Sequence, residues 1–102
     1  MTPPVAGQAA ALRAAAAFIA RECLPGLRVT AAYSALFIEV PRALGSPAAR
    51  TGLVARLAAA AGAAGLRRQP GAWQETVTAT GEISGHRAVI TTVIYEEDEE
   101  AP

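Results

Sequence analysis

The sequence predicts one α+β domain in the order αββαββ, with a four-stranded antiparallel sheet and two helices on one face. Three observations predict this class. Two alanine-rich segments each follow a Thr-Pro or Ser-Pro start signal, two pairs of β-branched and aromatic segments follow those helices, and 102 residues suffice for a single domain. Because each helix has only one apolar stripe, both helices are expected to cover the same face of the sheet.

The first half of the chain predicts a helix followed by a hairpin. Thr2 and the two prolines after it form a helix start, and larger side chains such as Leu12 recur at helical spacing. Pro25 and the glycine after it are expected to end this helix. The strands Leu27–Tyr33 and Leu36–Val40 then form a short hairpin.

A second helix starts after Ser46, which is followed by proline. Its expected apolar stripe comprises Leu53, Val54, Leu57 and Ala61, with Arg50 and Arg56 off the stripe, and glycines at 62 and 65 end it. A polar turn over residues 67–71 leads to a second hairpin. Its strands, Trp73–Ile83 and His86–Tyr95, are separated by a Ser-Gly turn.

The register of the second hairpin divides its side chains between two faces. One face is expected to press against the helices and carries Trp73, Val77, Ala79, Ile83, Ala88, Ile90 and Ile94. The opposite face is β-branched and nearly uncharged, so we interpret it as a contact surface for a second subunit or another protein. Its predicted interface residues are Thr76, Thr78, Thr80, Val89, Thr91, Val93 and Tyr95. The first hairpin is expected to extend this face through Arg28, Thr30, Ala32, Phe37 and Glu39.

The zero net charge hides an uneven distribution. All nine basic residues are arginines, and five of the nine acidic residues form a run over 96–100. Residues 1–95, the predicted domain, therefore carry a net charge of +5, whereas residues 96–102 are expected to form a disordered acidic tail.

This asymmetry motivates an alternative function, a nucleic-acid-binding accessory protein. Arg13, Arg21, Arg67 and Arg68 are the expected phosphate contacts, and the acidic tail would compete with nucleic acid for them.

Candidate chemistry is scarce. A single histidine, His86, and a single cysteine, Cys23, give no metal-ligand pair, and no catalytic constellation or phosphate loop is present. We therefore expect no cofactor, no metal and no enzymatic activity. A pocket between the helices and the sheet, around Trp73 and Tyr33, is the basis of a third and weaker alternative, a small-molecule or catalytic protein. The apolar segments are interrupted by arginines and the start of the chain lacks charge, so we expect a cytoplasmic protein without a membrane span.

The C-terminal hairpin also carries a faint resemblance. Trp73, Gly81, Gly85 and the segment Ala88–Tyr95 are similar to the hairpin of short uncharacterised proteins from actinobacterial phages and mobile elements. This resemblance implies an accessory or partner-binding role and assigns no residue. Together these observations predict a non-enzymatic binding or assembly module, homodimeric through the outer sheet face or a strand edge.

Overall fold

The computed structural model describes residues 4–22, 26–32 and 35–95, with side chains described from residue 9 onward. Several expectations fall outside these residues, namely those for the tail 96–102, for Cys23 and for Tyr33. The elements are helix α1 (Pro4–Glu22), strands β1 (Arg28–Ala32) and β2 (Ala35–Glu39), the 3₁₀ helix η1 (Arg42–Leu44), helix α2 (Pro47–Ala60), and strands β3 (Arg67–Pro70), β4 (Gln74–Ile83) and β5 (His86–Tyr95).

The fold is α+β, with two helices and a five-stranded mixed sheet in the order β1-β2-β5-β4-β3. The prediction of four antiparallel strands was wrong in two respects. The expected polar turn at residues 67–71 contains β3, which pairs antiparallel with β4, and β2 pairs parallel with β5. Each antiparallel connection reverses the direction of the chain. Because β3 adds one such connection before β4, β5 runs parallel to β2 and not antiparallel to it.

The β4–β5 hairpin has the predicted register, from Gln74 opposite Tyr95 to Ile83 opposite His86. Its two turn residues, Ser84 and Gly85, have φ angles of 50° and 82°. Positive φ at both central residues is the type I′ pattern, whose twist matches that of the flanking strands. This local geometry fixes which side chains of β4 and β5 lie on each face.

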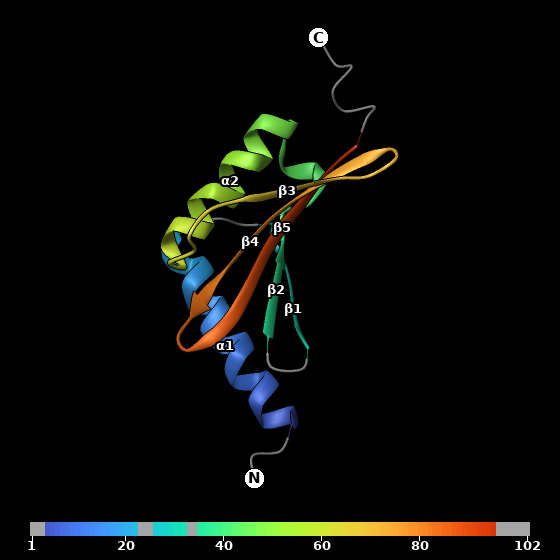
Figure 1. Ribbon diagram of the computed structural model, residues 1–102. Coiled ribbons are helices and arrows are strands. Elements are labelled where there is room, and N and C mark those ends of the chain that lie inside the picture. The colour runs from blue at the N-terminus through green and yellow to red at the C-terminus, as the bar shows by residue number, and fades with distance from the viewer. Residues whose placement is uncertain (1–3, 23–25, 33–34, 96–102) are drawn as a thin grey trace.

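Both helices pack on one face of the sheet, as predicted (Figure 1). Helix α1 contacts β1, β2 and β4, whereas α2 contacts β4 and β5. The core between these layers is made of small and medium apolar side chains. Its fully buried members include Ala15, Leu36, Ile38, Val54, Leu57, Val77, Ala88 and Ile90. Alternation along each strand leaves the opposite face of the sheet open.

Helix α1 presents a different stripe to the core from the one expected. Ala11, Ala15 and Phe18 are buried, whereas Leu12 is exposed. The positions 11, 15 and 18 are spaced by four and three residues and therefore form one stripe. Alanine at two of these positions allows the helix to lie close to the sheet. The stripe was predicted from the larger side chains, and Leu12 was therefore placed in it wrongly.

Helix α2 has the predicted boundaries, because the Ser46 side chain accepts a hydrogen bond from the Ala49 amide and Gly62 follows the helix with a φ of 70°. The expected position of Arg50 was wrong. Arg50 is only 1% exposed, since it lies on the same stripe as Val54 and Leu57 at spacings of four and seven residues.

Gly81 allows the end of α2 to approach β4 closely. The Glu82 amide donates a hydrogen bond of 2.9 Å to the Ala61 carbonyl oxygen, and a Cβ atom on Gly81 would collide with that same oxygen. A glycine is therefore required where the helix end meets the strand.

Candidate interaction surface

The open side of the sheet, here called the outer face, is formed by alternate residues of all five strands. The registers align its side chains in rows across the sheet. One row runs Arg28, Glu39, Thr91, Thr78 and Arg67, from β1 to β3. The neighbouring rows are Thr30, Phe37, Val89 and Thr80 on one side, and Val93, Thr76 and Gln69 on the other.

All seven residues predicted as the interface lie on the outer face, and they lie together on its two central strands. Thr80 and Tyr95 are exposed, whereas the other five are half-buried by their neighbours on the sheet. The hydroxyl oxygens of Thr78 and Thr91 lie 3.4 Å apart, in hydrogen-bonding range across the strands. This pairing reduces the demand of both hydroxyls for water, so the centre of the outer face is less polar than its composition suggests.

The first hairpin extends the outer face as expected. Phe37 is 39% exposed beside Val89, while its neighbours Leu36 and Ile38 are buried on the helix side. Charged groups lie around this apolar area. Arg28 and Glu39 form an ion pair of 3.7 Å, and Glu82 lies opposite Arg87 at the turn of the β4–β5 hairpin.

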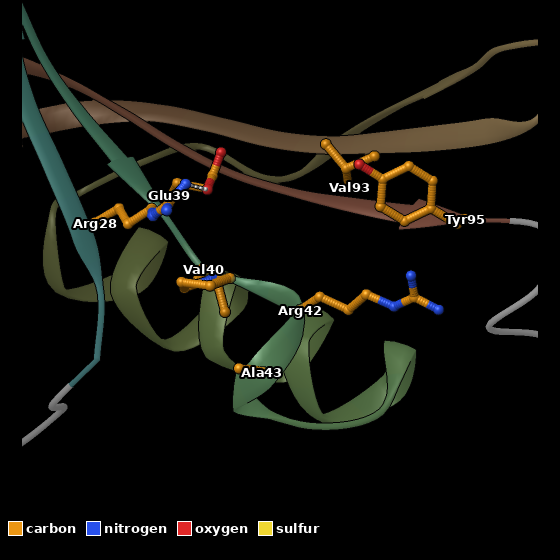
Figure 2. Close-up of a pocket in the computed structure, with 8 residues that line it drawn as sticks. Arg28, Glu39, Val40, Arg42, Ala43, Val93 and Tyr95 are labelled. Atoms are coloured by element: carbon orange, nitrogen blue, oxygen red, sulfur yellow. Dashed lines mark ion pairs between the residues drawn. The ribbon is translucent and has the colours of Figure 1, made fainter.

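A pocket of about 420 Å³ opens on the outer face where β1 begins, β2 ends and β5 continues. Its lining residues are Arg28, Glu39, Val40, Pro41, Arg42, Ala43, Val93 and Tyr95. Figure 2 shows Arg42 extending toward the Tyr95 ring from the segment that follows β2. The Arg42 guanidinium carbon lies 5.4 Å from the ring centroid, which is a cation–π distance. Residues distant in the chain meet here, so no local pattern in the sequence predicts this pocket.

A buried polar network supports the floor of this region from the helix side. Arg50 donates hydrogen bonds to the Val93 carbonyl oxygen at 2.6 Å and to the Gly45 carbonyl oxygen at 3.0 Å. Thr92, also buried, donates to the Val40 carbonyl oxygen at 2.9 Å. These bonds connect α2, the end of β2 and the end of β5, and so hold the pocket walls in place.

The four arginines of the nucleic-acid alternative lie on different parts of the molecule. Arg13 and Arg21 lie on α1, on the opposite side of the sheet from the outer face. Arg67 belongs to the outer face, whereas its neighbour Arg68 points to the other side and pairs with Glu75. Strand β3 separates the two side chains because successive residues of a strand alternate between faces. The nucleic-acid alternative stays a prediction.

The remaining predicted sites are not assembled in the described part of the chain. Trp73 was expected against the helices but is 76% exposed, because β4 begins only at Gln74 and Trp73 lies in the preceding turn. Within residues 4–22, 26–32 and 35–95, no cluster of potential metal ligands occurs, and no helix is long and apolar enough to cross a membrane.

No family model, curated protein or solved structure matches the chain. The resemblance of the C-terminal hairpin to phage and mobile-element proteins therefore stays a prediction.

Proposed function

We propose that this chain is a non-enzymatic assembly module that forms a homodimer through the outer face of its sheet. The observation that carries this proposal is the contrast in charge within that face. Its centre, formed by β-branched residues of β4 and β5 and by Phe37, carries no charge, while the ion pair of Arg28 and Glu39 lies toward one edge. Uncharged surfaces with a polar rim are typical of protein interfaces.

The shape of the outer face also suits a second sheet. Two sheets can pack face to face about 10 Å apart, as in a β-sandwich, and an even surface of β-branched side chains suits this packing. From ordinary strand dimensions the outer face covers roughly 550 Å² in projection, and its uneven side-chain surface brings the accessible area toward the ~800 Å² per partner of a standard interface. A second copy supplies an identical face, and a two-fold axis pairs the two.

A charge placed on the outer face, at Val93 beside the pocket, tests this proposal. We expect the unaltered protein to sediment as a dimer and Val93→Lys to sediment as a monomer, because the half-buried Val93 side chain would bring a desolvated ammonium group into the interface. The matched control is Ala55→Lys, which adds the same charge at an exposed position of α2. This control should remain dimeric.

Two results would contradict the proposal: a monomer in the unaltered protein at high concentration, or a Val93→Lys variant that still forms the dimer. Retention of a nucleic-acid ligand by a monomeric protein would instead favour the alternative that uses Arg13, Arg21, Arg67 and Arg68.

A further inference from the structure

Trp73 is the most exposed large apolar side chain in the described residues, at 76%. It lies in the turn between β3 and β4, which is closed by a hydrogen bond of 2.6 Å from the Gly71 amide to the Gln74 carbonyl oxygen. Figure 1 shows this turn projecting from the sheet at the end where β5 also ends. A tryptophan removes about 150–250 Å² from water when buried, so an exposed one at a projecting turn is a strong anchor for a protein contact.

The pocket on the outer face has the chemistry that an indole ring requires. Val40, Pro41 and Val93 supply apolar walls, and the guanidinium of Arg42 is already positioned beside the ring of Tyr95. Arginine and tyrosine both stack on indole faces, and a volume of about 420 Å³ leaves room for one side chain of this size.

Trp73 and the pocket lie at the same end of the sheet but on opposite sides of β5. Gln74, the residue after Trp73, pairs with Tyr95, which lines the pocket. The pocket opens on the β2 side of β5, whereas the turn that carries Trp73 joins β3 and β4 on its other side.

A two-fold axis parallel to β5 relates these two features. Rotation about such an axis faces the two outer faces together and places β4 over β2 of the second copy and β3 over its β1. The rotation does not move any residue in the direction parallel to β5, so features at one end of the sheet stay at that end in both copies. The β3–β4 turn of each copy therefore comes to lie over the pocket of the other, beyond the start of its β1 and the end of its β2.

We propose that Trp73 of each protomer occupies the outer-face pocket of a second copy, in a homodimer whose two-fold axis runs parallel to β5. This inference rests on the proposed homodimer and specifies its orientation. A second copy is the occupant because every chain carries both an exposed tryptophan and a matching pocket at one end of the sheet. The two-fold arrangement satisfies both pairs at once.

The single tryptophan of the chain gives a direct test. Acrylamide quenching of Trp73 fluorescence, measured from dilute to concentrated protein, should fall several-fold as the dimer forms, and the emission should shift to shorter wavelength. In sedimentation experiments, Trp73→Ala should raise the dimer dissociation constant about 30-fold, the effect of losing an interface anchor. Leu12→Ala, which removes another exposed apolar side chain, on α1, should leave that constant unchanged.

A second variant tests the pocket without altering Trp73. Ala43→Glu adds a longer, charged side chain to the pocket wall, so it should weaken the dimer and keep Trp73 open to acrylamide. Circular dichroism spectra that match the unaltered protein would show that both variants fold.

The outcomes separate this inference from the proposed function. The pocket contact would be overturned by a dimer in which acrylamide still reaches Trp73 as freely as in the monomer and which Trp73→Ala does not weaken. The outer-face dimer would then still stand. A monomer at every concentration would overturn both.

Discussion

The helix-covered face and the outer face of the sheet are built from alternate residues of the same strands, yet their compositions differ sharply. On β5 the covered side carries Ala88, Ile90 and Ile94, all buried, whereas the outer side carries residues such as Val89 and Thr91, which are half-buried. The covered face needs apolar side chains that fit the helices. The outer face keeps β-branched side chains although no described helix covers it, and this contrast is the basis of the homodimer proposed above.

The covered face also shows how the molecule accommodates polarity. Arg50 and Thr92 are both buried there, and every buried side-chain nitrogen or oxygen in the described residues has a hydrogen-bond partner. On the outer face the hydroxyls of Thr78 and Thr91 approach each other in the same way. At this one pair, one hydroxyl donates to the other, so the two groups need fewer partners from water than two isolated threonines would.

The largest effect should come from the covered face. Ile90→Ala is expected to lower the free energy of unfolding by about 2–5 kcal/mol, because Ile90 is fully buried and the helices cannot fill the cavity. Val89→Ala, one residue away on the outer face, should lower it by about 1 kcal/mol or less. Urea unfolding in the Val93→Lys background measures folding without dimerisation. Equal losses would remove the distinction between the faces.

The arginines of α2 offer a comparison of buried and exposed charge. Arg50→Ala should cost about 3 kcal/mol, since it removes hydrogen bonds from a charged group and leaves the Val93 carbonyl oxygen without that donor. Arg56→Ala should cost about 1 kcal/mol, because the Arg56 side chain is exposed, although it forms an ion pair with Glu22 and donates a hydrogen bond to the Glu22 carbonyl oxygen. Thermal unfolding of the two variants checks this order, and a smaller loss for Arg50→Ala would show that the buried network contributes little.

A smaller effect is expected where α2 approaches β4. Gly81→Ala should lower stability by about 1–3 kcal/mol, because the new methyl group collides with the Ala61 carbonyl oxygen and the helix end must shift. Gly65→Ala is the control, since no atom lies within 4 Å of the added Cβ. Chemical denaturation of both variants measures the difference. If Gly81→Ala is as stable as the control, the close contact is not needed for folding.

Local sequence patterns predicted much of this fold, whereas the pairings between strands that are far apart in the chain have no such pattern. The Ser-Gly turn and strand alternation were sufficient for the β4–β5 register, and Ser46 with its following proline located the start of α2. Strand β3 was missed because Arg67–Pro70 is short, polar and exposed, and its pairing with β4 is its main strand feature. The parallel pairing of β2 and β5 depends on that missed strand and has no local signal.

The candidate surface was predictable to the same extent. Alternation placed the central threonines and valines on one face, but the pocket joins residues that are far apart in the chain, such as Arg42 and Tyr95. Trp73 was assigned to the wrong environment because strand alternation was extended one residue beyond the start of β4. The buried position of Arg50 was detectable from its spacing to Val54, and only its charge argued against it.

Sedimentation equilibrium of the unaltered protein shows whether the outer face associates with a second copy of itself. We expect a species with twice the chain mass of 10.4 kDa, in equilibrium with monomer only on dilution. A mass of one chain that persists as the concentration is raised would contradict it.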